Sequence, residues 1–113
     1  MLRQLFYNLI GNSLKHGENA SQIRIRCKRN EGDELALVYE DNGLGIPTAE
    51  KPRLFQEGYT TGRGSGYGLY LIKKMMEVYG WRIQETGAPG KGAQFTITIP
   101  KKNRDGRENY RFA

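Results

Sequence analysis

Residues 41–69 read DNGLGIPTAEKPRLFQEGYTTGRGSGYGL, and seven of the 28 residues from 41 to 68 are glycine. A flexible linker would mix glycine with serine and carry few bulky side chains. This stretch instead contains large apolar residues, among them Leu54 and Phe55. The combination predicts ordered loops in which the backbone approaches another group closely, because glycine has no Cβ to block the approach.

Regular elements are predicted on both sides of this glycine-rich segment. Apolar residues at helical spacing predict helices over 2–16 and 68–79, and a short helical turn is expected near 49–55. Strand patterns cover 22–28, 34–40, 81–86 and 94–99, with a turn at 30–33 that makes the first two a hairpin. The order of these elements predicts an α+β sandwich with an antiparallel or mixed sheet.

The strand expected at 22–28 alternates between two kinds of side chain. Its odd-numbered positions are apolar, namely Ile23, Ile25 and Cys27. Its even-numbered positions are basic, namely Arg24, Arg26 and Lys28. We therefore expect a half-buried strand with a solvated basic face, and Cys27 as a small buried hydrophobe.

A polar stripe runs along the first predicted helix. At 100° per residue Gln4, Asn8, Asn12 and Lys15 fall within about 80° of one another, beside a broad apolar arc. An asparagine carbonyl oxygen is a hard neutral ligand that suits Mg²⁺, and a lysine can reach a phosphate as a point charge. Two surface amides without a function explain the same pattern, so the stripe alone leaves both interpretations open.

The glycine-rich segment itself holds two candidate binding loops. Asp41, Gly43 and Gly45 follow a strand, where they form either an ordinary turn or a site in which the carboxylate accepts a hydrogen bond from the amino group of adenine. Residues 62–69 lead straight into a helix, whose free N–H groups favour an anion. Their spacing fits neither the dinucleotide-binding fingerprint nor a Walker loop.

The composition of the chain excludes several classes of site and of protein. A single cysteine excludes an internal disulfide, and one histidine with one cysteine leaves no four-ligand zinc site made by the protein alone. No apolar run approaches the roughly 20 residues of a membrane span, and we expect no signal peptide and no membrane contact. The net charge is +6, of which residues 101–113 carry half, so a solvated basic tail is favoured over nucleic-acid binding.

Four segments, in family order, resemble the signature boxes of sensor histidine kinases. Residues 8–16 (NLIGNSLKH) are similar to the N box and 41–46 (DNGLGI) to the first glycine box. Residues 54–61 (LFQEGYTT) are similar to the F box and 64–69 (GSGYGL) to the second glycine box. The chain is identified as a member of the histidine kinase catalytic domains, in the GHKL superfamily that also contains DNA gyrase, heat-shock chaperone ATPases and mismatch-repair ATPases.

This resemblance implies an α/β sandwich of the Bergerat type, with a mixed, mostly antiparallel sheet and helices packed on one face. Residues 1–100 would form the ATP-binding domain, truncated at its N-terminus and without the first strand of the family. Residues 101–113 would be a basic polar tail that has no counterpart in the family.

The resemblance also implies a role for particular residues. Asn12 would ligate Mg²⁺, Asn8 would assist at the metal and the γ-phosphate, and Asp41 would read adenine. Lys15 and His16 would contact phosphate or ribose, and Arg63 either adds charge at the phosphates or is a free side chain of a short lid between Phe55 and Gly64. The other expected nucleotide contacts are Gly43, Gly45, Ile46, Phe55, Tyr59, Thr60, Thr61, Gly64, Ser65, Gly66, Tyr67, Gly68 and Leu69.

The residue at position 8 bears on the reaction class. In related ATPases a glutamate at the matching position activates water, and an amide cannot act as that base. Asn8 therefore favours a protein-histidine kinase that holds ATP-Mg²⁺ for transfer to a histidine in a dimerisation domain that this chain lacks. The chain alone is not expected to autophosphorylate.

The expected partners are ATP or ADP, the dimerisation domain of the parent protein and a response regulator. We expect a cytoplasmic location, and the resemblance leaves open a membrane anchor elsewhere in the parent. Two alternatives remain: an anti-sigma-type serine/threonine kinase or hydrolysing ATPase on the same fold, and a basic nucleic-acid-binding module. The second would use the basic strand face and the tail.

Overall fold

The computed structural model describes residues 2–16, 20–59 and 68–101 of the chain. The helices are α1 (Leu2–His16), the short 3₁₀ helix η1 (Thr48–Arg53) and α2 (Gly68–Tyr79). The strands are β1 (Ile23–Arg29), β2 (Leu35–Asp41), β3 (Arg82–Glu85) and β4 (Gln94–Ile99). Among these residues no helix combines the length and the apolar character needed to cross a bilayer.

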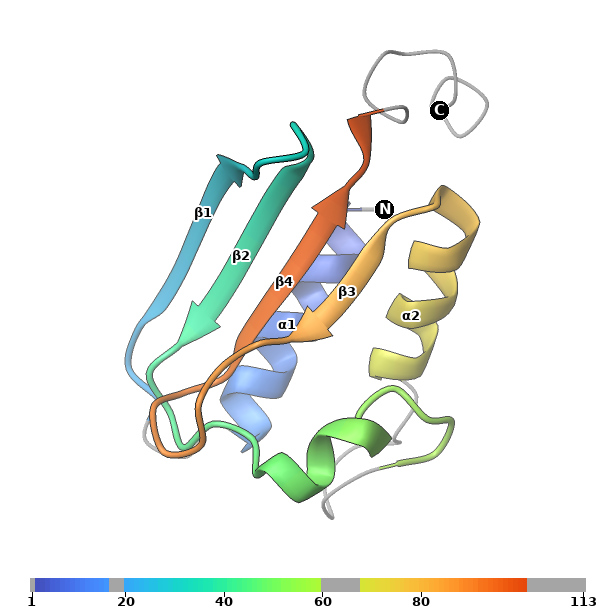
Figure 1. The fold of residues 1–113 in the computed structure, drawn as a ribbon. Helices are drawn as coiled ribbons and strands as arrows, with labels where there is room; N and C mark the ends of the chain where they lie inside the picture. Colours follow the sequence, from blue (N-terminus) through green and yellow to red (C-terminus); the bar gives the residue numbers. More distant parts are fainter. Residues whose placement is uncertain (1, 17–19, 60–67, 102–113) are drawn as a thin grey trace.

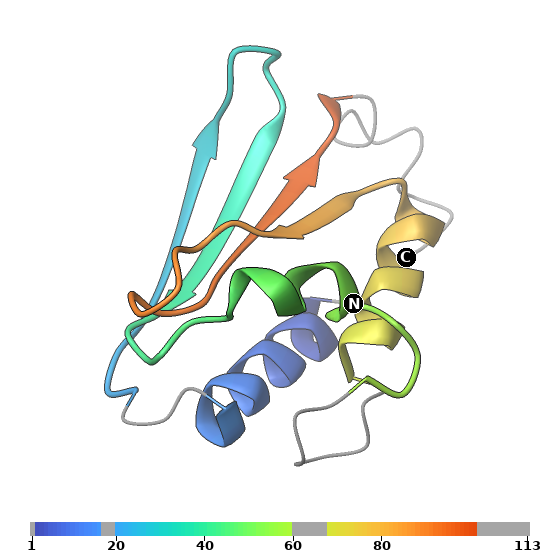
Figure 2. The same cartoon turned by 60° about the horizontal axis from the view of Figure 1, so that its bottom comes forward.

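The four strands form one sheet in the order β1-β2-β4-β3, and every pairing between them is antiparallel. Figure 1 shows β2 and β4 in the middle of this sheet, with β1 and β3 at its edges. Figure 2 shows α1 and α2 packed on the same face of the sheet, and Figure 1 shows η1 at one end of the molecule, below α2. The α+β sandwich predicted from the sequence is confirmed, and the described strands pair only in the antiparallel sense.

The core lies between the two helices and the three strands that they cover. Leu5 and Leu9 of α1 meet Ile72 and Met76 of α2, and all four side chains are fully buried. They pack against a sheet face formed by Tyr39, Phe95, Ile97 and Ile83. Because each such side chain contributes roughly 1.5–3 kcal/mol on burial, this cluster holds the helices against the sheet.

A Schellman motif ends α2. Gly80 has φ of 76°, and its N–H donates to the carbonyl of Glu77 at 3.3 Å. The N–H of Trp81 donates to the carbonyl of Met76 at 2.9 Å. Glycine suits the left-handed position, so the predicted stop at residue 80 is confirmed and the chain turns directly into β3.

The burial predicted for β1 is wrong. Ile23 and Ile25 are exposed by more than 40%, and Cys27 is exposed as well. Their register with β2 places them on the sheet face that carries Tyr39, so the predicted alternation is correct. The error has a tertiary cause: β1 is at the edge of the sheet away from the two helices, and it contributes no residue to the buried core beneath α1 and α2.

Candidate functional site

Asp41 is the last residue of β2, and its side chain is almost completely buried, with 7% of the residue exposed. Its Oδ1 accepts hydrogen bonds from the backbone N–H groups of Gly43 and Ala93, each at 3.0 Å. Its Oδ2 accepts a hydrogen bond from the hydroxyl of Ser13 on α1 at 2.7 Å. These three donors satisfy a carboxylate that would otherwise be costly to bury.

The turn between β3 and β4 lies directly against the loop after Asp41. The N–H of Gly90 donates to the carbonyl of Leu44 at 2.7 Å, and the N–H of Asp41 donates to the carbonyl of Ala93 at 2.9 Å. Gly45 has φ of 77°, and a Cβ on it would lie 3.0 Å from the carbonyl oxygen of Gly92. The left-handed φ of Gly45 and this tight backbone contact therefore both favour glycine at position 45.

Asn8 of α1 lies against Gly68, the first residue of α2. Its Nδ2 donates to the carbonyl of Gln4 at 2.9 Å. A Cβ on Gly68 would lie 2.8 Å from Asn8 Oδ1, so glycine at this position allows the two helices to approach. The start of α2, where a helix has N–H groups without a partner inside the helix, therefore lies close to the amide of Asn8.

Asn12 carries a buried amide nitrogen that has no hydrogen-bond partner among the described residues. A buried polar atom of this kind usually has a hydrogen-bond partner, which a bound ligand or water would supply. The nitrogen and the oxygen of an asparagine amide are assigned from their hydrogen bonds. Rotating the amide by half a turn puts the carbonyl oxygen where the nitrogen was. In that orientation Asn12 presents a neutral oxygen that suits Mg²⁺.

The segment after η1 is anchored at two aromatic residues. The ring of Phe55 packs edge-on against that of Phe95, with centroids 6.4 Å apart. The hydroxyl of Tyr59 donates to the carboxylate of Glu50. Burial, and then the hydrogen bond and negative charge of Glu50, raise the pKa of Tyr59 above its usual value, so the hydroxyl stays a donor at neutral pH.

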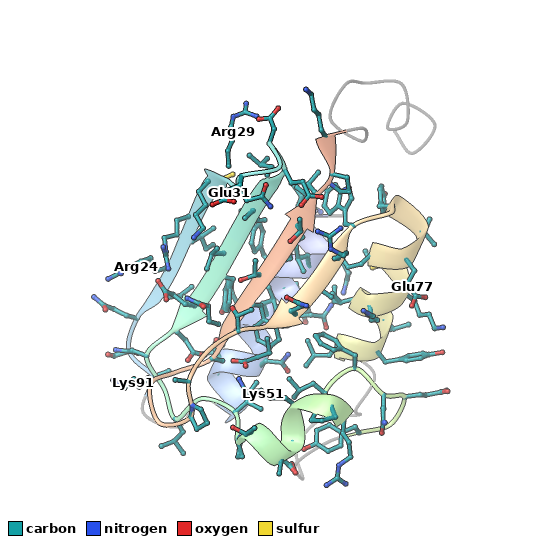
Figure 3. The ribbon with its side chains drawn as sticks, viewed as in Figure 1. Arg24, Arg29, Glu31, Lys51, Glu77 and Lys91 are labelled. Carbon is teal, nitrogen blue, oxygen red and sulfur yellow. The ribbon has the colours of Figure 1, made fainter. Side chains whose placement is uncertain are left out.

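A buried ion pair attaches η1 to the β3–β4 turn. Lys51 donates to the carboxylate of Glu85 and to the carbonyl of Gly87, and the side chain of Glu85 is 1% exposed. Glu85 also accepts hydrogen bonds from the N–H groups of Gln94 at 2.9 Å and Gly87 at 3.3 Å. Figure 3 shows Lys51 close to the ends of β3 and β4. The same turn therefore contacts both η1 and the loop after Asp41.

The sequence profile of the family described as histidine kinase-, DNA gyrase B- and HSP90-like ATPases matches residues 1–103. The chain belongs to this ATPase family.

Individual relatives agree with this assignment. The chain is 35% identical over 102 residues to the alginate biosynthesis sensor protein KinB of Pseudomonas aeruginosa, with 88% of this chain and 17% of that protein covered. It is 37% identical over 108 residues to the circadian input-output histidine kinase CikA of Synechococcus elongatus, with 89% and 14% covered. The chain therefore spans less than a fifth of the length of these two proteins.

A solved structure shows the same fold. Full-length ShkA in complex with AMPPNP superposes with a TM-score of 0.77 at 26% identity, over 88% of this chain and 21% of ShkA. The nucleotide analogue is a property of the ShkA structure.

The described part of the chain brings several predicted site residues of the ATPase family into contact. Asn8 meets Gly68, and Asp41 ends β2 directly before the loop that contains Gly43 and Gly45. The side chains of Ile46, Phe55 and Leu69 pack partly against the core. The other predicted positions, Thr60, Thr61, Arg63, Gly64, Ser65, Gly66 and Tyr67, lie outside the described residues, as do the side chains of Lys15 and His16.

Four residues at the site were missed in the sequence analysis. Ser13 and Tyr39 form a hydrogen-bonded chain with Asp41, and Gly92 and Ala93 contact it through the backbone. A serine inside a helix is a signal that could have been followed, because its hydroxyl seeks a partner. The last glycine in the sequence GAPGKG, Gly92, is a weaker signal, since a turn alone accounts for it.

Proposed function

We propose that this chain is the catalytic ATP-binding domain of a sensor histidine kinase. The observation that carries the proposal is Asp41, a buried carboxylate held by three donors at the end of β2. An ionised carboxylate accepts hydrogen bonds and donates none, so it favours the exocyclic amine of adenine over the carbonyl of guanine. ATP or ADP is therefore the nucleotide that this site suits.

The phosphates would lie between α1 and the start of α2. Asn8 of α1 lies against Gly68 there. Asn12 is also on α1, and its buried amide nitrogen has no hydrogen-bond partner among the described residues. The first N–H groups of α2 favour an anion, and Asn12 would help to hold Mg²⁺. Bound Mg²⁺ would neutralise charge on the phosphates and so lower the barrier to phosphoryl transfer.

Transfer to a protein, rather than hydrolysis, is supported by the residue at position 8. The amide of Asn8 cannot take a proton from water, so this site lacks a general base at that position. We place the acceptor histidine in a dimerisation domain of the parent protein, and a response regulator after it. Because ATP is the substrate, the domain would work in the cytoplasm.

Titration calorimetry with ADP tests the nucleotide site. Asp41→Asn is expected to weaken ADP binding about 10- to 100-fold, because it removes a hydrogen bond to a charged group. Asn12→Ala should weaken the dependence of binding on Mg²⁺. Asp33→Asn is the matched control, since Asp33 lies in the turn at the other end of the β1–β2 hairpin and tolerates asparagine at its φ of 60°.

Unchanged ADP affinity in Asp41→Asn, or no binding to the folded unmodified chain, would contradict the proposal. The kinase assignment has a separate test in the rate of ATP hydrolysis. Rapid turnover of ATP by this chain alone would favour a hydrolysing ATPase instead.

A further inference from the structure

The hydrogen bonds of the Asp41 carboxylate extend through Ser13 to Tyr39. Ser13 donates to Asp41 Oδ2 at 2.7 Å, and its Oγ lies 2.8 Å from the hydroxyl oxygen of Tyr39. All three residues are buried, and Tyr39 has no exposed surface. Tyr39 and Asp41 lie two positions apart on β2, so their side chains are on the same face of the sheet.

The direction of each proton in this chain follows from counting donors. A serine hydroxyl has one proton, and an ionised carboxylate has none to give. The proton of Ser13 is therefore committed to Asp41, and the bond between Ser13 and Tyr39 must use the proton of Tyr39. Burial is the main cause that raises the pKa of Tyr39, which keeps its hydroxyl protonated at neutral pH.

The same count shows what is left for a ligand. A carboxylate offers about four lone-pair positions. Gly43 and Ala93 use two of them on Oδ1, and Ser13 uses one on Oδ2. One acceptor position remains on Oδ2, and no further donor among the described residues is hydrogen-bonded to it. A ligand that meets this atom must therefore be a hydrogen-bond donor.

We propose that Ser13 and Tyr39 act as a positioning relay that makes Asp41 selective for a 6-amino purine over a 6-oxo purine. This inference rests on the proposed function, and it adds a specificity role for two residues outside the adenine-reading carboxylate. Ser13 holds Oδ2 in place and excludes water that would compete with the amine. Tyr39 stops the hydroxyl of Ser13 from turning toward the carbonyls of its own helix, where serine side chains commonly bond.

The test compares ADP with inosine diphosphate, in which a carbonyl replaces the amine. Calorimetry in the presence of Mg²⁺ gives the ratio of the two dissociation constants. Ser13→Ala is expected to reduce this ratio about 5- to 10-fold, because ADP loses an oriented acceptor and inosine diphosphate loses nothing. Tyr39→Phe should reduce it by about 2- to 3-fold, since it removes only the support of Ser13.

The double variant separates a relay from two structural contributions. In the Ser13→Ala background, Tyr39→Phe should leave the ratio unchanged, because the residue through which Tyr39 acts is already gone. Tyr7→Phe removes the same hydroxyl from an exposed tyrosine of α1 and serves as the control. Thermal unfolding of each variant checks that it is folded, and if Ser13→Ala does not fold, Tyr39→Phe carries the test alone.

The outcomes are distinct. A ratio that stays unchanged in Ser13→Ala and Tyr39→Phe, while ADP still binds and Asp41→Asn still loses selectivity, overturns the relay and leaves the proposed function intact. If each variant weakens the binding of ADP and of inosine diphosphate equally, and the losses add in the double variant, the relay is overturned and both residues have a purely structural role. No binding of ADP to the unmodified chain would overturn both proposals together.

Discussion

Gly92 lies where the turn between β3 and β4 crosses the end of β2. Its φ is 98°, and a Cβ on it would lie only 2.0 Å from the carbonyl oxygen of Asp41. That oxygen belongs to the backbone and cannot move away as a flexible side chain could. Position 92 therefore has two independent reasons to be glycine, one of conformation and one of space.

Alanine substitutions at Gly92 and Gly90 separate these two reasons. Gly90 is in the same turn with φ of 82°, and a Cβ there meets nothing within 4 Å. Gly90→Ala should cost about 1–2 kcal/mol of unfolding free energy, which is the cost of the left-handed backbone. Gly92→Ala should cost at least about 1–3 kcal/mol more, because the clash forces the loops apart. Urea denaturation measures both, and equal losses would show that the contact with Asp41 is unimportant.

The ion pair between η1 and β3 determines how the irregular segment sits on the sheet. Glu85 is at the end of β3 on the helix-covered face, opposite Phe95. Lys51 reaches it from a short helix that contains no buried residue of its own. A buried charge needs a partner, so this pair attaches η1 where apolar contacts are few.

Removing one charge of this pair tests its contribution. Lys51→Met should lower the free energy of unfolding by about 3 kcal/mol, because Glu85 would remain buried without its partner. Adding Glu85→Gln should recover part of that loss, since a neutral amide needs no counter-charge. Lys74→Met breaks an exposed pair with Glu77 and should cost less than about 1 kcal/mol. Urea denaturation compares the variants, and additive losses in the double variant would contradict this account.

At the scale of the whole molecule, the helix layer covers the sheet unevenly. Leu37 pairs with Cys27 on one side and with Ile97 on the other, so all three share one face of the sheet. Ile97 is fully buried in the core, and Cys27 is exposed. The cover that the helices give a strand, and not its own pattern of residues, therefore decides how much of it is buried.

Matched truncations of two isoleucines measure this asymmetry. Ile97→Ala should cost about 2–5 kcal/mol, because it leaves a cavity in the core. Ile25→Ala should cost less than about 1 kcal/mol, because 48% of that residue is already exposed. Chemical denaturation of this chain measures both values. Similar losses at the two positions would mean that β1 is covered in solution.

Much of the fold could be predicted from short-range pattern. The bounds expected for both α-helices and for the last strand agree with α1, α2 and β4. Each of these elements carries its own periodicity, and Gly80 ends α2 through bonds to residues a few positions away. The ordered loop after Asp41 could also be predicted, because its glycines follow a strand and allow close backbone contacts. The predicted loop before Gly68 lies outside the described residues and stays a prediction.

What could not be predicted depends on residues that are distant in sequence. Ser13 and Asp41 are 28 residues apart, and Lys51 and Glu85 are 34 apart. No local rule pairs them, because their contact exists only when the helix layer and the sheet are assembled. For the same reason the alternation of β1 indicated which side chains share a face, whereas burial of that face depended on where the helices lie. Periodicity and caps act within one helix or strand, so they can be recognised in the sequence. The hydrogen-bond partners of Asp41 are determined by packing between elements, which only the tertiary structure shows.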